Sequence, residues 1–526
     1  MQPGALSSEQ LWRNAQAALA RNDARAAYAS LLSLVRQMPA HANAHLLLGG
    51  IAHAEGRLRD ATRHALDAAR HVGPDAAQIA SVINALLLVG EVVAARAMLA
   101  HPALASSRNA PLLAHLAGAE QMIGEHARAL ALLDRAIGAG LDNSDVRYLR
   151  GVQLTFNGRL EEAAAELERC LRLGPSYGRA AVTLARLRKQ TAVDNHLAQI
   201  EILSQRAPRG SEDHAAFEFA RYKEYEDLGC HDEAWSALER GNAIMAQRLR
   251  PDPQRENARI NALIECCSTR FVEDHADTRH EGPQPIFIVG MPRSGTTVLE
   301  RILGNHSQVT SAGELGDFAR QLRWAADHVT SQPVDEVILE RAPRIDFAEV
   351  GRRYLAQTQW RAQGKPYFVD KLPINYLQAG FIRRALPQAR ILHMTRAAID
   401  VCFSNYRAFF GEGYAYSYDF DALAAHYLDY RRLMRHWHSV MPGAVLDVSY
   451  DALTQNPEAV AREVFTFCDL PFEFAALDIR KNVNPSATLS TMQIREGIQS
   501  HPRRDWLWYS NELVELRRSI AVEPEL

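Results

Sequence analysis

The feature that most constrains the fold is a repeat with a period of 34 residues in the first third of the chain. Glycine recurs at this interval, and alanine recurs five residues after each glycine. The glycines are Gly56, Gly90, Gly124 and Gly158, and the alanines are Ala61, Ala95, Ala129 and Ala163. Asn22 and Ala27 extend both columns one period earlier, and asparagine commonly replaces glycine where the backbone needs a positive φ. Five units in one register predict an array of helical hairpins, with the alanine at each close helix crossing.

Segments such as EGRLRDATRHALDAA and NGRLEEAAAELERCLRLGP resemble the second helix of the tetratricopeptide repeat. Residues 1–189 are therefore identified as a tetratricopeptide array, which implies an α-solenoid. Its concave face either recognises a peptide or protein or only supports a neighbouring domain. Residues 190–282 break the register and predict an irregular helical linker with one degenerate repeat, in which Gly229 and Ala234 keep the five-residue offset.

The chain has 526 residues, which is too long for one core, and its pattern changes at Pro283. From there, short apolar strands alternate with long helical stretches, which predicts an α/β domain over residues 283–526. The expected strands are 286–289, 367–369, 391–394 and 445–448. In a parallel, doubly wound sheet of this kind, ligands bind beyond the carboxyl ends of the strands.

Charge and cysteine content limit the classes of partner. The net charge of −3 and the pI of about 6.7 show no excess of positive charge of the kind that attracts nucleic acid or an anionic membrane. The six cysteines lack zinc-ligand spacing and are too sparse for a disulfide scaffold, so we expect reduced thiols. The N-terminal residues lack a signal-peptide pattern, and no apolar stretch is long enough to span a membrane. A soluble, cytoplasmic protein is expected.

Residues 285–303, PIFIVGMPRSGTTVLERIL, run from an apolar strand through a glycine-bracketed loop into an amphipathic helix. The backbone N–H groups of residues 294–297 would converge at a helix N-terminus, where an anion is favoured. The Walker lysine of ATP-binding loops is missing, and the only cation is Arg293. A planar guanidinium without a metal suits a phosphosulfate better than a magnesium nucleotide.

The string PRSGTT after a strand resembles the loop of sulfotransferases that use 3′-phosphoadenosine 5′-phosphosulfate (PAPS). The similarity is greatest to the tyrosylprotein sulfotransferases and to bacterial tetratricopeptide-linked relatives. It implies a P-loop-like sulfotransferase domain, with Arg293 both binding PAPS and acting in catalysis. The other implied PAPS-binding residues of the loop are Ser294, Gly295, Thr296 and Thr297. The alternative is an ordinary strand-to-helix turn in which Ser and Thr cap the helix.

The resemblance extends to polar residues after the other expected strands. It implies that Lys371, in the string DKLP, bridges the transferring group and its leaving phosphate. Arg396 and Ser404, eight residues apart, would bind the 3′-phosphate that distinguishes PAPS from ATP. Tyr450 would lie against the nucleotide.

The general base is expected in the segment SQVTSAGELGDF. By resemblance to the tyrosylprotein branch, Glu314 would take the proton from the acceptor hydroxyl. His306 is the rival base, because many other sulfotransferases use histidine; its alternative role is that of a residue at a helix C-terminus.

The segment NPSATLSTMQIREGIQSHPRRDW resembles the late cofactor loop of the same family. It implies that Ser490 lies near the sulfuryl group as a catalytic residue, with Thr488 and Arg495 binding PAPS. Trp506 would cover the adenine. Asp505 stands where the family often has lysine, so Arg503 or Arg504 would replace that cation.

Together these residues predict in-line transfer of a sulfuryl group from PAPS to an acceptor hydroxyl, with no metal required. A protein or peptide tyrosine is the favoured acceptor, and carbohydrates and small phenols are the alternatives. Two rival functions are a P-loop kinase or NTPase, and a repeat adaptor with an inactive sulfotransferase domain.

Overall fold

The computed structural model describes residues 6–274, 281–481, 497–498 and 504–521. The chain divides into two compact units. One contains Met1–Gly140 with Gly316–Thr358, and the other contains Leu141–Leu315 with Gln359–Leu526.

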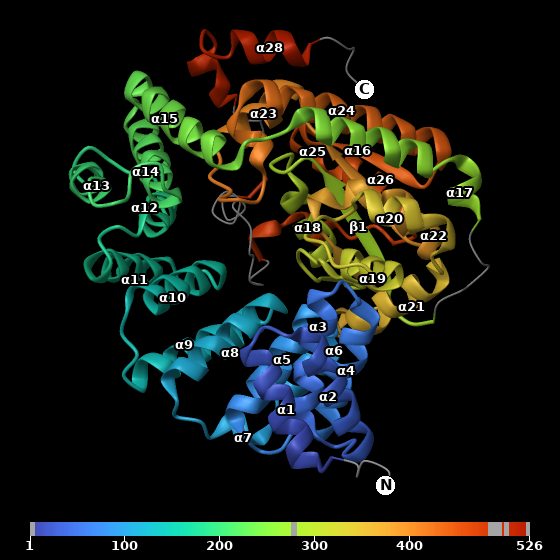
Figure 1. Ribbon diagram of the computed structural model, residues 1–526. Coiled ribbons are helices and arrows are strands. Elements are labelled where there is room, and N and C mark those ends of the chain that lie inside the picture. The colour runs from blue at the N-terminus through green and yellow to red at the C-terminus, as the bar shows by residue number, and fades with distance from the viewer. Residues whose placement is uncertain (1–5, 275–280, 482–496, 499–503, 522–526) are drawn as a thin grey trace. The chain divides into compact units, whose positions relative to one another are not determined.

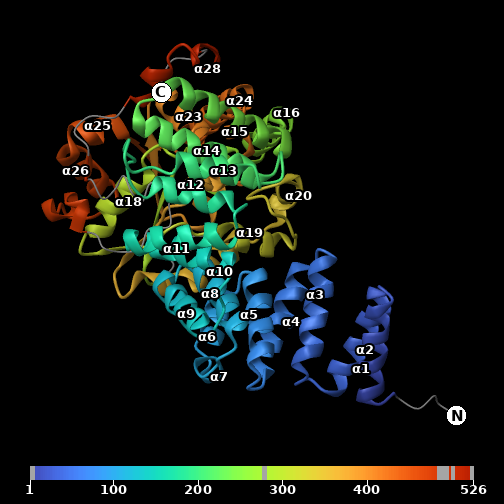
Figure 2. The ribbon, with the colours of Figure 1, turned by 90° about the vertical axis from the view of Figure 1, so that its left-hand side faces the viewer.

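Helical hairpins build the N-terminal part of the first unit, and Figure 2 shows them following one another along the chain. The helices are α1 (Ser8–Ala20), α2 (Ala24–Gln37), α3 (Ala42–Ala54), α4 (Leu58–His71), α5 (Ala76–Leu88), α6 (Val92–Leu99), α7 (Pro102–Ala105), α8 (Ala110–Met122) and α9 (His126–Gly138). The predicted turn residues all have positive φ, 61° at Asn22 and 79° to 82° at Gly56, Gly90 and Gly124. The paired alanines are at most 1% exposed, as expected for close helix crossings. Both columns of the repeat are confirmed.

The first unit also takes in a later segment, which contains α19 (Asp317–Ala326), α20 (Glu336–Arg341), the short 3₁₀ helix η1 (Ala342–Arg344) and α21 (Phe347–Thr358). Buried polar contacts join it to the repeats. The amide of Gln357 donates to Glu91 at 2.8 Å, and Arg353 forms an ion pair with the same carboxylate. The domain boundaries expected from the sequence, 1–189, 190–282 and 283–526, stay a prediction, because these compact units group residues by contact.

The second unit begins with further helices: α10 (Ser144–Phe156), α11 (Leu160–Leu173), α12 (Gly178–Arg186), α13 (Leu197–Ser204), α14 (Glu212–Leu228), α15 (His231–Leu249), α16 (Pro253–Cys266) and α17 (Thr269–Glu273). Gly158 and Gly229 have φ of 80° and 75°, and Ala163 and Ala234 are fully buried. The degenerate repeat is therefore a true helical hairpin, formed by α14 and α15.

A five-stranded, fully parallel sheet forms the centre of the second unit. Its strands are β1 (Gln284–Gly290), β2 (Val309–Ser311), β3 (Tyr367–Asp370), β4 (Arg390–Thr395) and β5 (Val445–Ser449), in the order β2-β3-β1-β4-β5. Four of these strands match the sequence prediction. The prediction missed β2, which has only three residues and pairs with β3 at the edge of the sheet.

The remaining helices of this unit are α18 (Thr296–Asn305), α22 (Ala379–Ala385), α23 (Ala398–Tyr406), α24 (Phe420–Val440), α25 (Tyr450–Gln455), α26 (Pro457–Phe467) and α28 (Val514–Ile520). The short 3₁₀ helices are η2 (Gln359–Ala362), η3 (Pro373–Gln378), η4 (Ala415–Tyr418), η5 (Phe474–Leu477), η6 (Ile479–Lys481) and η7 (Asp505–Tyr509). Helices α18, α25 and α26 cover one face of the sheet through a core that includes Ile286, Ile302 and Phe465. Within the second unit, α16 packs along α24 (Figure 1).

The chain order places a topological switch beside β1. From β1 the chain continues to β2 and β3 on one side, and it then crosses to β4 and β5 on the other. In open parallel sheets, the crevice at such a switch is where ligands bind.

All six cysteines are free thiols, as expected from the sequence. Among the helices in the described part of the chain, none combines the length and the apolar character that crossing a bilayer requires.

Candidate functional site

The loop between β1 and α18 is held by close contacts that require glycine at two positions. Gly290 and Gly295 have φ of 148° and 108°. A Cβ atom at Gly290 would lie 2.7 Å from the carbonyl oxygen of Met394, and one at Gly295 would overlap the ring of Tyr450. Arg293 also has a positive φ, 68°. The loop therefore lies against the carboxyl end of β4 and the start of α25.

The loop contains a buried hydroxyl and leads into the N-terminus of a helix. Ser294 is 1% exposed, and its Oγ has no hydrogen-bond partner within the described residues. The buried Thr296 and Thr297 begin α18, where the first N–H groups of a helix have no intrahelical acceptor. One detail differs from the prediction, because the backbone N–H of Ser294 donates to the carbonyl of Met291 at 3.2 Å. An orphaned buried hydroxyl beside a helix N-terminus fits an anionic ligand.

Lys371 and Glu314 meet at the ends of two neighbouring strands. Glu314 follows β2 and Lys371 follows β3, and the Nζ of Lys371 lies 2.5 Å from Oε1 of Glu314. Glu300 of α18 lies 3.6 Å from the same Nζ. The side chain of Lys371 is 1% exposed, whereas that of Glu314 is 37% exposed. Burial disfavours the charge of Lys371, but the two carboxylates outweigh this effect and raise its pKa.

Arg396, Ser404 and Tyr450 also come together, and Arg293 joins them. Arg396 follows β4 and donates to the carbonyl oxygen of Arg293 at 3.3 Å. The Nε of Arg293 donates to Oγ of Ser404 at 3.4 Å. The guanidinium of Arg396 lies 4.9 Å from the centroid of the Tyr450 ring. The pair that the sequence assigned to a 3′-phosphate thus lies beside the loop after β1.

Two further arginines, missed from the sequence, act on this site. The pKa of Arg293 is lowered to about 9, because burial disfavours its charge and Arg407, Arg186 and Arg396 repel it. Arg407 follows α23, whereas Arg186 is the last residue of α12. Arg407 lies three residues after Ser404, whereas Arg186 lies outside every motif that the sequence analysis singled out.

His306 has a structural position at the far end of α18. Its ring is fully buried, Nε2 donates to the carbonyl oxygen of Pro471 at 2.8 Å, and Nδ1 accepts from the backbone N–H of Gln308 at 3.1 Å. Both ring nitrogens are therefore engaged. The ten residues of α18 separate His306 from the loop by about 15 Å.

A cavity of about 170 Å³ opens at the same edge of the sheet, lined in part by Ser294, Thr395 and Arg396.

Among the described residues, two groups lie close enough to hold a metal ion: His45 with His64 and Asp67, and His393 with His438 and Asp447. In the second group both histidines hydrogen-bond Oδ1 of Asp447, at 2.6 and 2.9 Å.

Some predicted residues of the late loop fall outside the described residues. They are Thr488, Ser490, Arg495 and Arg503. Trp506 is described, and the guanidinium of Arg517 lies 5.2 Å from its ring centroid. Asp505 forms an ion pair with Arg407 at 2.9 Å, and Arg504 is exposed.

Comparison with known proteins identifies the domain that carries this site. Residues 285–474 match the model of the sulfotransferase family. An uncharacterized protein of Aquifex aeolicus is 31% identical over 68% of this chain, which spans 48% of that protein. A protein-tyrosine sulfotransferase of Drosophila melanogaster is 25% identical over 38% of this chain and 40% of its own length. The chain thus spans about half the length or less of these two relatives.

A further relative is a repeat protein by name. A TPR repeat-containing thioredoxin of Arabidopsis thaliana is 47% identical over 64 residues, which are 12% of this chain and 9% of that protein. The helical hairpins and the family match lead to one conclusion. Residues 285–474 are a domain of the sulfotransferase family, and the chain joins this domain to tetratricopeptide-type helical repeats.

Proposed function

We propose that this protein is a sulfotransferase that moves a sulfuryl group from PAPS to an acceptor hydroxyl. The observation that carries the proposal is the convergence of polar groups at the carboxyl edge of the sheet. The loop after β1, the Lys371–Glu314 pair and the Arg396–Ser404 pair come from different strand ends and share the switch beside β1. The match of residues 285–474 to the sulfotransferase family supports this assignment.

PAPS is the proposed donor because the site is built for anions and lacks the Walker lysine. The Oγ of Ser294, which has no partner among the described residues, and the first N–H groups of α18 would bind the 5′-phosphosulfate. Arg396 and Ser404 would bind the 3′-phosphate, and Tyr450, packed on Gly295, would offer an aromatic surface to the nucleotide. Arginine and lysine would supply the positive charge that a magnesium ion supplies in ATP-binding loops.

Glu314 is the proposed general base, and Lys371 is the proposed electrophilic partner. When bound, PAPS would supply an activated sulfuryl group. The exposed carboxylate of Glu314 would accept the proton of the acceptor hydroxyl, while Lys371 would neutralise charge on the leaving phosphate. The buried Glu300 keeps Lys371 charged and limits its movement.

A peptide or protein tyrosine is the proposed acceptor, and the repeats are the proposed acceptor-binding region. The repeats contain a groove of about 580 Å³ along α1, α3 and α5, lined by residues that include Trp12, Leu47 and Leu88. Solenoids commonly bind extended peptides on such concave surfaces. The name of the Drosophila relative supports a tyrosine acceptor.

The test is to incubate the purified protein and a cell lysate with sulfur-labelled PAPS, and in parallel with phosphorus-labelled ATP. Mass spectrometry then locates the label. We expect label from PAPS on an acceptor hydroxyl with the wild type, and at most trace transfer with Glu314→Gln. Label transferred from ATP would indicate a kinase instead. Absence of transfer from either donor would indicate a repeat adaptor with an inactive domain.

A further inference from the structure

Two histidines and an aspartate meet on the face of the sheet that α24 covers. His393 of β4 and Asp447 of β5 are partners in the register of these neighbouring parallel strands. Leu392 and Val448, the residues next to them, belong to the core on the other face. Because side chains alternate along a strand, His393 and Asp447 share the opposite face. His438, in the last turn of α24, reaches the same carboxylate.

The geometry of this group is close to that of a metal site. Oδ1 of Asp447 lies 2.6 Å from Nδ1 of His393 and 2.9 Å from Nε2 of His438, and all three atoms lie within 4.8 Å of one another. Tetrahedral Zn²⁺ keeps its ligand atoms about 3.3 Å apart, so an ion could enter after these contacts open by less than about 1 Å. The side chains of His438 and Asp447 are 33% and 39% exposed, which leaves a route from solvent.

The other ring nitrogen of His393 is held as it is in metal sites. Nε2 hydrogen-bonds the hydroxyl of Tyr430, and both side chains are buried. Histidine ligands usually donate their second N–H to such an outer group, which fixes the orientation of the ring. For Nδ1 of His393 to bind a cation, the ring proton must lie on Nε2, where the oxygen of Tyr430 can accept it.

The group in the repeats is a weaker candidate, because an arginine already neutralises its carboxylate. Asp67 lies 3.9 Å from Nδ1 of His45 and forms an ion pair with Arg70 at 2.6 Å. In the part of the chain that the structure describes, the ion pairs of Asp447 are with the two histidines. The negative charge of Asp447 is therefore more available to a cation.

We propose that His393, His438 and Asp447 bind one divalent transition-metal ion, and that this ion is Zn²⁺. Two imidazole nitrogens and one carboxylate oxygen are typical zinc ligands, and the fourth position would hold water. The inference goes beyond the proposed function and does not rest on it, because the proposed sulfuryl transfer uses no metal. The ion would tie α24 to β4 and β5, beside the cavity that His393 and Tyr430 line together with Ser294.

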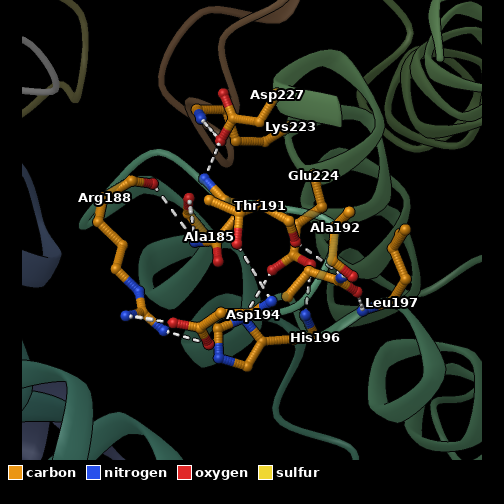
Figure 3. Close-up of polar contacts among 12 residues, drawn as sticks. Ala185, Arg188, Thr191, Ala192, Asp194, His196, Leu197, Lys223, Glu224 and Asp227 are labelled. Atoms are coloured by element: carbon orange, nitrogen blue, oxygen red, sulfur yellow. Dashed lines mark hydrogen bonds and ion pairs between the residues drawn. The ribbon is translucent and has the colours of Figure 1, made fainter. Parts of the chain in front are cut away.

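The experiment is titration calorimetry of the full chain with ZnCl₂, after a chelator has removed any bound metal. The test variant is His438→Gln, because glutamine still donates a hydrogen bond to Asp447 but lacks the imidazole ligand. The matched control is His196→Gln. Figure 3 shows His196 paired with Glu224, whose Oε1 lies 2.7 Å from Nδ1 of the ring. This pair contains one histidine and belongs to neither of the two groups that could hold a metal.

We expect the wild type and His196→Gln to bind the same number of zinc ions, and His438→Gln to bind one fewer. Loss of an outer partner alone costs metal sites roughly 10- to 100-fold in affinity, so loss of a ligand should raise the Kd at least about 100-fold. Tyr430→Phe removes only the hydroxyl behind His393, and it should keep the site and raise its Kd roughly 10- to 100-fold.

Thermal unfolding distinguishes a metal site from a cluster that is only hydrogen-bonded. Without metal, the Tm of His438→Gln should match that of the wild type, because the hydrogen bond to Asp447 is kept. Zn²⁺ should raise the Tm of the wild type more than that of His438→Gln, since an ion that binds only the folded state stabilises it. An equal rise in both proteins would contradict the proposed site.

Two further results would overturn the inference, and both would leave the proposed function intact. They are a wild type that binds no zinc ion, and equal numbers of zinc ions bound by the wild type and His438→Gln. Because Tyr430→Phe keeps all three ligands, its zinc affinity tests the site even if His438→Gln is unstable. An affinity equal to that of the wild type would contradict ligation through His393.

Discussion

At the scale of single residues, the two carboxylates beside Lys371 differ in exposure. Glu300 is buried and accepts a hydrogen bond from Ser311 at 2.5 Å, so its place is fixed. Glu314 is exposed at the end of β2 and closest to the ammonium group. Of these two carboxylates, Glu314 is the exposed one, which is why we propose it as the base.

We predict that Glu314→Gln lowers turnover by roughly 10² to 10⁴ while the Kd for PAPS stays near that of the wild type. The amide keeps the size of the side chain and accepts a hydrogen bond from Lys371, but it cannot take the acceptor proton. Steady-state kinetics with labelled PAPS, combined with calorimetry, measures both quantities.

His306 provides the control for this prediction. Because both of its ring nitrogens hold the end of α18 in place, His306→Ala should lower Tm and leave the turnover of the folded enzyme largely unchanged. The opposite pattern, with activity retained in Glu314→Gln and lost in folded His306→Ala, would show that the base is misassigned.

A second residue-scale prediction concerns Glu120 in α8. Burial raises the pKa of Glu120 from 4.5 to about 7, and its Oε2 has no partner among the described residues. The unfolded chain releases this proton near pH 4.5 and the folded chain near pH 7, so the free energy of unfolding falls as pH rises between the two. The loss is at most about 3 kcal/mol.

Glu120→Gln is neutral at every pH and should remove that loss. We expect its Tm to exceed that of the wild type at about pH 8 and to approach it near pH 5, as measured by thermal unfolding across this range. A difference in Tm that does not depend on pH would contradict the assigned titration.

At the scale of elements, local backbone constraints determine how much the sequence can predict. The turns at Asn22 and Gly56 and the small alanines at the helix crossings were predictable, because positive φ and close packing restrict residue type. The strand, loop and helix around Gly290 were predictable for the same reason. By contrast, β2 has only three residues, which carry no detectable alternation.

The turn glycines offer a matched test of the packing between the repeats and α19. A Cβ at Gly90 would lie 3.0 Å from Cβ of Arg320, whereas a Cβ at Gly56 would meet no atom within 4 Å. Both residues have positive φ, so both alanine variants carry the same backbone strain, about 1 to 2 kcal/mol. We expect Gly90→Ala to lower the free energy of unfolding more than Gly56→Ala does. Equal losses in chemical denaturation would show that α19 does not pack against this turn.

At the scale of the whole molecule, the compact units do not follow the order of the sequence. Residues 316–358 belong with the first repeats, and the later helices α10–α16 belong with the sheet. In the second unit, Arg407 pairs with Glu226, and Phe219 packs on Phe409 with ring centroids 5.3 Å apart. The sequence could predict a helical repeat array and an α/β domain. It could not predict that residues 316–358 group with the first repeats, because this grouping depends on contacts between residues distant in the chain.

The central claim is that the carboxyl edge of the sheet binds a nucleotide with a 3′-phosphate, and calorimetry tests it without knowledge of the acceptor. The wild type should bind adenosine 3′,5′-bisphosphate far more tightly than ATP. Arg396→Ala should remove most of that preference, because a charged hydrogen bond lost at this site costs about 1.5 to 3 kcal/mol. Equal affinity of the wild type for the two nucleotides, or an unchanged preference in Arg396→Ala, would contradict the account.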